Sequence, residues 1–146
     1  MKRLIQIIAV LSVICFAGMQ TVNAQAPVQI TWTLAESGCN CHTLQDSIYR
    51  VIISVVDVCA QPPAEIYNDV NIESGSASSS DFILDVDCND YNNEPCFRII
   101  ATVIKLCPDG YGGYTIECQG YSISDLFTCD ELQGTTPLSV PIVHVD

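Results

Sequence analysis

The sequence contains few cations. Only five Lys and Arg residues stand against 17 Asp and Glu residues. Lys2 and Arg3 lie at the N-terminus, so Arg50, Arg98 and Lys105 are the strong cations of the rest of the chain. All of the carboxylates lie after residue 24, and that part therefore has a formal charge of 3 − 17 = −14. Such a surface is repelled by nucleic acid and by anionic membranes, and we expect neither as a partner.

The sequence also lacks the motifs of common enzymes. We find no Gly-x-Ser-x-Gly elbow, phosphate-binding loop or His-Glu-x-x-His motif. The two histidines are His42, in a cysteine-rich segment, and His144, near the end of the chain. A glycosidase needs two carboxylates in a cleft, and a small β domain has little room for one. We therefore expect a protein without catalytic activity.

No apolar run is long enough for a membrane helix, which needs about 20 residues. The longest run, Leu4–Ala17, follows the cations Lys2 and Arg3 and precedes the short residues Val22-Asn23-Ala24. A charged start, a short apolar stretch and a small-residue cleavage site are typical of a secretory signal peptide. We expect cleavage after residue 24 and no membrane span in what remains.

The remaining residues, 25–146, are predicted to form a single domain outside the cytoplasm, either secreted, periplasmic or at the cell surface. Eight of the nine cysteines lie in it: Cys39, Cys41, Cys59, Cys88, Cys96, Cys107, Cys118 and Cys129. An even number in an exported chain indicates a disulfide framework. Each disulfide typically stabilises a small domain by about 2–4 kcal/mol.

The spacing of the cysteines suggests pairs but does not fix them. Cys88 and Cys96 flank a polar turn that a disulfide could close. Cys107 could pair either with Cys118 across a glycine-rich connection or with Cys59 at the end of another apolar run.

The segment Cys39-Asn40-Cys41-His42 also has the residue types of a zinc site. Two separate disulfides from Cys39 and Cys41 are the simpler interpretation. The spacing is one residue short of the motif that attaches c-type haem.

Alternation of apolar and polar residues predicts most of the secondary structure. Segments with period two indicate strands with one buried face. They are residues 28–34, 82–88, 114–119 and 138–142, with a weaker strand at 66–72.

Two other segments, 49–58 and 97–106, are apolar at almost every position and rich in Val and Ile. Such runs are typical of strands that are central in a sheet or buried on both faces. A short helix is expected near Ser124–Leu132, with Ser124 as its N-cap. About seven short strands without βαβ alternation predict an all-β, disulfide-stapled, antiparallel β-sandwich of the immunoglobulin or fibronectin type.

Alternating polar residues after one predicted strand are the best candidates for binding a metal. Asp85, Asp87, Asn89 and Asp90 could supply oxygen ligands for calcium. The pattern departs from an EF-hand, because its sixth position is Asp90 rather than Gly and its twelfth is Cys96 rather than Glu. The solvated face of a strand explains the same residues without a metal.

Aromatic residues gather around a glycine-rich connection at 108–113. Tyr111, Tyr114 and Tyr121 lie in it or close to it. Tyrosine combined with glycine is typical of adaptable recognition loops. We therefore predict these three tyrosines as candidate binding residues, the alternative being that they only cover the hairpin and the core.

These features favour a secreted, non-catalytic structural or adhesive module, such as a subunit of an extracellular assembly. Its partner would be another extracellular protein or a second copy of itself. One alternative is a module that binds carbohydrate or protein with the help of calcium. A further alternative is a cysteine-rich protease inhibitor that presents residues 108–113.

Overall fold

The chain forms two β-sheets and four disulfides. The computed structural model describes residues 25–35, 39, 41, 47–88 and 93–146. Its strands are β1 (Ala26–Leu34), β2 (Ile48–Asp57), β3 (Ala64–Ser74), β4 (Ser79–Leu84), β5 (Phe97–Pro108), β6 (Tyr114–Phe127) and β7 (Val143–Val145). A short helix, α2 (Cys129–Leu132), lies between β6 and β7.

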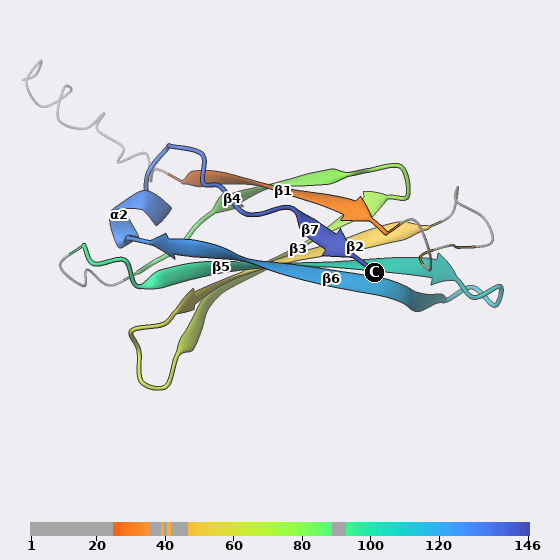
Figure 1. Ribbon diagram of the computed structural model, residues 1–146, viewed down its shortest axis with the longest axis horizontal. Helices are drawn as coiled ribbons and strands as arrows, with labels where there is room; N and C mark the ends of the chain where they lie inside the picture. The colour runs from red at the N-terminus through yellow and green to blue at the C-terminus, as the bar shows by residue number, and fades with distance from the viewer. Residues whose placement is uncertain (1–24, 36–38, 40, 42–46, 89–92) are drawn as a thin grey trace, which may run out of the picture.

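The strands are divided between a three-stranded sheet in the order β4-β1-β7 and a four-stranded sheet in the order β3-β2-β5-β6. The three-stranded sheet lies above the four-stranded sheet in Figure 1. All neighbours in the four-stranded sheet are antiparallel, whereas β1 and β7 are parallel. The two long apolar segments of the sequence, β2 and β5, are the central strands of their sheet, as one interpretation of their composition predicted.

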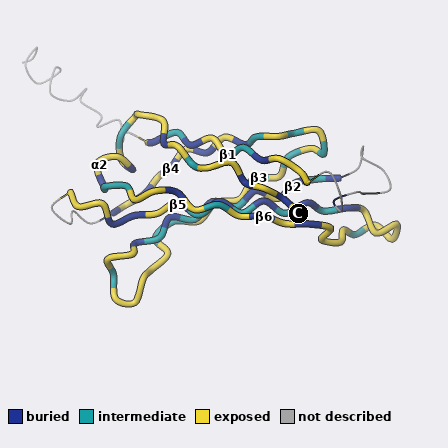
Figure 2. Tube along the Cα trace, viewed as in Figure 1, coloured by how far each residue is buried: buried dark blue, intermediate teal, exposed yellow. Residues whose placement is uncertain are grey.

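The core lies between the two sheets. Alternate residues of β2 and β5, among them Val51, Ile53 and Val103, are fully buried. They pack in one cluster with inward residues of the other sheet, such as Val28 and Ile30. Figure 2 shows this as buried positions along the strands of both layers, with exposed connections between them.

Four disulfides link segments that are distant in sequence. They are Cys39–Cys118, Cys41–Cys107, Cys59–Cys96 and Cys88–Cys129. The prediction that Cys39 and Cys41 enter separate disulfides is confirmed. The two cysteines of each pair are 37 to 79 residues apart in the sequence, so each disulfide closes a long loop and removes many conformations from the unfolded chain.

The three pairings that spacing suggested are wrong. Because β2 and β5 are antiparallel, the end of β2 meets the start of β5, which places Cys59 beside Cys96 rather than Cys107. Cys107 and Cys118 lie on neighbouring strands but are out of register, since Cys107 is opposite Thr115. Cys88 pairs with a cysteine of α2 instead of closing its own turn.

The helix is shorter than predicted. Strand β6 continues to Phe127, and the N-cap of α2 is Thr128 rather than Ser124. The Ser124 hydroxyl instead accepts the Ile99 backbone N–H at 2.9 Å, at a point where the pairing of β5 and β6 is irregular. Ser124, which the sequence predicts as a helix N-cap, therefore forms a hydrogen bond with a backbone N–H inside the sheet.

The C-terminal strand is shifted from the predicted 138–142. Leu138 forms an isolated bridge to Val28, and the regular strand begins at Val143. Pro141 has no backbone N–H to donate, so regular pairing can begin only after it.

Side chains and the C-terminal segment cover two edges of the sheets. The backbone N–H of Gln119 in β6 donates to the Asp146 carbonyl at 3.3 Å. On β4, the carbonyl of Asp81 accepts the Asn71 side-chain amide at 3.0 Å, and the carbonyl of Ile83 accepts the Tyr67 hydroxyl at 3.3 Å. These contacts occupy groups that could otherwise pair with a strand of another chain.

Candidate functional site

The four-stranded sheet has an apolar outer face, turned away from the core. Because side chains alternate along a strand, the residues between the buried positions of β2 and β5 point outward. The register then aligns outward residues of β3 and β6 beside them. The apolar outer face consists of Ile48, Ile52, Val56, Val70, Ile72, Ile100, Ile104, Leu106, Tyr114, Ile116, Tyr121 and Ile123.

This face is open to solvent. Ile72 is 58% exposed, Ile116 is 62% exposed and Tyr121 is 72% exposed. The outward residues of the central strands, such as Ile52 and Ile104, are half-buried by their neighbours on the sheet. Isolated surface Ile or Tyr residues are normal, whereas here apolar residues are grouped across four strands, with Arg50, Ser54 and Thr102 between them.

The charges on this face differ from those of the whole molecule. Arg50 lies opposite Ile72 and Ile104, and Arg98 lies opposite Leu126. Among the positions paired in the described register, Glu65 at one corner is the carboxylate on this side. The strongly acidic chain therefore presents two arginines and an apolar surface here.

The third cation after residue 24 lies inside the molecule. Lys105 is fully buried on the inner side of β5, and its Nζ donates to the Cys39 carbonyl at 2.7 Å. The contact ties β5 to the segment that carries two of the disulfides.

A hollow of about 450 Å³ lies where the apolar outer face meets the C-terminal segment. Its walls come from Ile100, Thr102, Gln119, Gly120, Tyr121, His144 and Asp146. No residue with a side chain fits in place of Gly120, because the His144 backbone carbonyl occupies the position that a Cβ atom would take. A hollow beside an exposed tyrosine is a suitable receptor for an anchoring side chain of a partner.

The glycine-rich hairpin beyond β5 and β6 is held by one carboxylate. Oδ1 of Asp109 accepts the N–H groups of Tyr111 at 2.8 Å and Gly113 at 2.9 Å. These hydrogen bonds lower the pKa of Asp109. Gly110 and Gly112 have positive φ angles of 80° and 91°, which glycine adopts without strain. The turn holds Tyr111 at its tip, 97% exposed.

The three predicted binding tyrosines therefore fall in two places. Tyr114 and Tyr121 lie on the apolar outer face, whereas Tyr111 lies at the hairpin tip. The arginines and the outward isoleucines of this face were not among the predicted site residues. The signal for those on β2 and β5 is the continuous apolar composition of 49–58 and 97–106, which indicates burial on both faces or a central position in the sheet.

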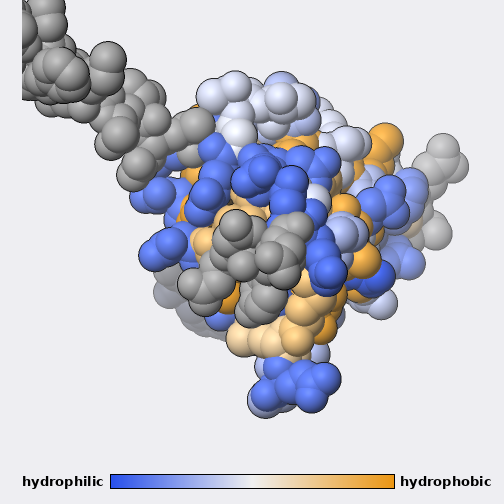
Figure 3. Space-filling view, turned by 90° about the vertical axis from the view of Figure 1, so that its left-hand side faces the viewer, coloured by the Kyte–Doolittle hydropathy of each residue, from blue (hydrophilic) through white to orange (hydrophobic). Residues whose placement is uncertain are grey.

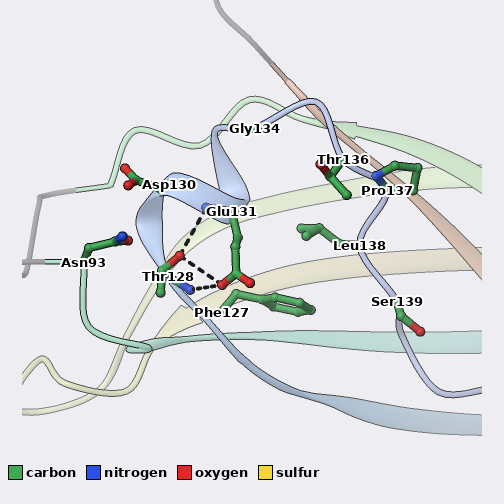
Figure 4. A pocket seen from close by; sticks show the side chains of 10 residues that line it. All are labelled: Asn93, Phe127, Thr128, Asp130, Glu131, Gly134, Thr136, Pro137, Leu138 and Ser139. Atoms are coloured by element: carbon green, nitrogen blue, oxygen red, sulfur yellow. Dashed lines mark hydrogen bonds between the residues drawn. The ribbon is translucent and has the colours of Figure 1, made fainter.

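A second cavity lies at the other end of the molecule, beside α2, with a volume of about 600 Å³. Figure 4 shows Asn93, Thr128 and Asp130 on one side of it, and Leu138 with Thr136, Pro137 and Ser139 on the other. The Glu131 carboxylate accepts both the N–H and the hydroxyl of Thr128, at 2.7 and 2.9 Å, and so completes the capping box of α2. Glu131 therefore has a structural role in this cavity.

The end that carries α2 is mostly hydrophilic on the surface seen in Figure 3.

The predicted calcium-binding residues lie only partly within the described part of the chain. Asp85 and Asp87 are exposed on the segment after β4, and Asn89 and Asp90 lie outside the described residues. The described part of the chain contains no group of three His, Cys, Asp or Glu side chains placed to hold a metal ion. Calcium binding stays a prediction.

No helix in the described part of the chain is long and apolar enough to cross a membrane. Comparison of the chain with models of protein families, with curated proteins and with solved structures finds no match.

Proposed function

We propose that this chain is a secreted, non-catalytic structural or adhesive module that acts as a subunit of an extracellular assembly. Its two sheets would form a β-sandwich of the immunoglobulin or fibronectin type, exported after removal of residues 1–24. The observation that carries the proposal is the apolar outer face of the four-stranded sheet, which exposes large side chains such as Ile116 and Tyr121.

No described residue of the chain covers this face, which a partner molecule would bury. An exposed Ile or Leu side chain gains roughly 1.5–3 kcal/mol when it is fully removed from water. The rest of the fold supports a durable scaffold, since four disulfides restrict the unfolded chain and are typical of proteins outside the cytoplasm.

The proposal is tested in the cells that make this protein. The chain would be tagged at its C-terminus, and its size in the extracellular fraction would be measured by gel filtration with light scattering, in calcium and in chelator. We expect particles much larger than the 15.9 kDa full chain in both conditions. A chain found only as a monomer outside the cell, or retained inside it, would contradict the assembly role. Assembly that is lost in chelator would favour the calcium-dependent alternative.

A further inference from the structure

We infer that the apolar outer face of the four-stranded sheet binds a second copy of this chain, with the two faces packed against each other in a two-fold symmetric dimer. This inference rests on the proposed role as an assembly subunit and names the first contact of that assembly. Four observations carry it: the area of the face, its composition, its charge and the covered edges of the sheets.

The area fits a dimer. Four strands spaced about 4.8 Å apart are roughly 19 Å wide, and the stretch from Ile48 to Val56 is roughly 30 Å long. The flat projection is thus about 600 Å², and protruding side chains raise the accessible area above it. Stable interfaces bury about 800 Å² on each partner, whereas the largest apolar patch of a monomer is typically about 300–600 Å².

The composition is that of an interface core. Tyrosine and arginine are enriched in such cores, and lysine, aspartate and glutamate are depleted. The face carries Tyr114, Tyr121, Arg50 and Arg98 among aliphatic residues, with the uncharged polar residues Ser54, Asn68, Thr102 and Gln119 between them. Glu65 lies at a corner, and Asp146 lines the hollow at the rim. A guanidinium packs well on an aromatic ring. Two arginines and two tyrosines on each copy make the set complementary to itself.

The charge favours this face as the place where two acidic chains can meet. The bulk of the carboxylates lies elsewhere, so contact through this face keeps the like charges of the two copies apart. The outer face of the three-stranded sheet is different, because it carries Asp81 beside Gln29 and Thr33 beside His144. Two such polar faces would bury hydrogen-bonding groups that water already satisfies.

The contacts on β4 and at Gln119 of β6 disfavour strand addition at those two edges, and the other edge of the four-stranded sheet is β3. The C-terminal segment bonds to β6 at Gln119, and side chains of Asn71 and Tyr67 occupy carbonyls of β4. Sheets that pack face to face lie about 10 Å apart and interdigitate their side chains. The hollow beside Tyr121 would then receive a side chain of the other copy.

The first experiment measures self-association of the purified mature protein by sedimentation equilibrium, from about 1 μM to about 1 mM. We expect a reversible dimer with a dissociation constant in the micromolar range or below. Thr102→Lys places a cation at the centre of the face, near Arg50, and should weaken the dimer by about 100-fold. The matched control is Thr31→Lys, an equally half-buried position that points outward from the three-stranded sheet.

The direction of the change in dimer affinity separates a local contact from a general effect of net charge. Both variants reduce the negative net charge by the same amount, which by itself strengthens association between acidic chains. Weakening by Thr102→Lys alone therefore reports the local contact. Unfolding is excluded when circular dichroism and the intact mass with four disulfides match those of the wild type. Equal behaviour of the two variants would overturn the proposed interface.

A second experiment locates the contact without disrupting the centre of the face. The chain after residue 24 has one lysine, Lys105, and it is buried. Gln119→Lys adds an exposed amine at the rim of the apolar outer face, and Gln29→Lys adds one to the other outer face. A short amine-reactive cross-linker should join copies of the Gln119→Lys protein, at least tenfold more efficiently than copies of the Gln29→Lys protein.

The outcomes separate this inference from the proposed function. A wild-type protein that stays monomeric up to about 1 mM overturns the self-docking inference. If the same chain is nevertheless found in large extracellular particles that Thr102→Lys dissociates, the assembly role stands and the face binds a different subunit. If no such particles exist either, both proposals fail.

Discussion

The outer faces of the two sheets are built by different rules. On the three-stranded sheet, outward polar groups pair with each other: Gln29 donates to Asp81 at 2.8 Å, and Thr33 bonds to the His144 ring at 2.9 Å. On the four-stranded sheet, the outward positions are mostly aliphatic or aromatic, with exposed residues such as Ile116 and Tyr121. The polar groups of the first face bond to each other, whereas the second face leaves large apolar side chains exposed to water.

If the apolar outer face binds a partner as proposed, the apolar pattern of its strands reflects burial in the assembly and not in the isolated chain. The inner face of β2 and β5 is covered by the core, whereas their outer face is open to solvent in the described part of the chain and is apolar apart from Arg50, Ser54, Arg98 and Thr102. When the sequence of a strand predicts burial on both faces but one face is exposed to solvent in the structure, a binding partner is expected on that face.

The largest effect should come from comparing the two sides of β2. Ile53→Ala removes a fully buried side chain from the core and should lower the free energy of unfolding by about 2–5 kcal/mol. Ile52→Ala, one residue earlier on the outer side, should cost less than about 1 kcal/mol in dilute monomer. Urea unfolding at low protein concentration measures both. A large loss for Ile52→Ala under these conditions would mean that the outer face contributes to the core of the monomer.

A smaller effect is expected at the seam between β3 and β4. The Asn71 amide donates to the Ser80 hydroxyl and to the Asp81 carbonyl, both at 3.0 Å. Asn71→Ala should cost about 1–2 kcal/mol, because one partly buried and one exposed hydrogen bond are lost. It should also open the edge of β4 to strand pairing, which raises aggregation on heating.

The control for this seam is Asn68→Ala, whose amide bonds to Ser54 on the exposed outer side. Thermal unfolding monitored by circular dichroism and turbidity compares the two variants. If Asn68→Ala aggregates as readily as Asn71→Ala, the edge of β4 is not what the Asn71 side chain protects.

The polar outer face should respond weakly to mutation. Gln29→Ala removes an exposed hydrogen bond to Asp81, and water replaces the lost partner on both groups. The free energy of unfolding should change by less than about 0.5 kcal/mol. The self-association measured by sedimentation should also stay the same. A clear loss of association in this variant would place the contact between copies on the three-stranded sheet instead.

Sequence patterns predicted the β-rich character, the central position of β2 and β5 and the participation of all eight cysteines in disulfides. They did not predict the pairs, because a disulfide depends on which strand ends meet: Cys59 finds Cys96 only once β2 and β5 are antiparallel neighbours. The extension of β6 past Ser124 was missed for a similar reason. Its hydroxyl satisfies Ile99 on a neighbouring strand, a tertiary contact with no local signature.

The candidate site was predicted only in its aromatic part. Tyr114 and Tyr121 were found because tyrosine near glycine is typical of recognition surfaces. Ile72 and Ile104 were not, since a continuous apolar run gives no sign of which side the chain itself covers. The register that aligns them beside Arg50 is a property of the assembled sheet.

The smallest and most local effect concerns the hairpin that extends β5 and β6 beyond the apolar outer face. Hydrogen bonds from the N–H groups of Tyr111 and Gly113 lower the pKa of Asp109 below its ordinary value. A carboxyl with a lowered pKa in the folded state favours that state at pH values above its unfolded pKa. The contribution is lost as the pH falls through the folded pKa. The hairpin should therefore keep its shape at neutral pH and loosen only in acid.

Amide chemical shifts of Tyr111 and Gly113 followed by NMR should show this transition with a midpoint below the ordinary pKa of aspartate, about 3.9. Asp109→Asn should abolish the transition and increase hydrogen exchange at Gly113, while amides in the middle of β5 stay unchanged. The exposed Asp125 provides a control carboxylate on β6. If Asp109→Asn also weakens the dimer, the ordered hairpin extends the contact beyond the sheet. If it does not, the apolar outer face binds the second copy without help from the hairpin.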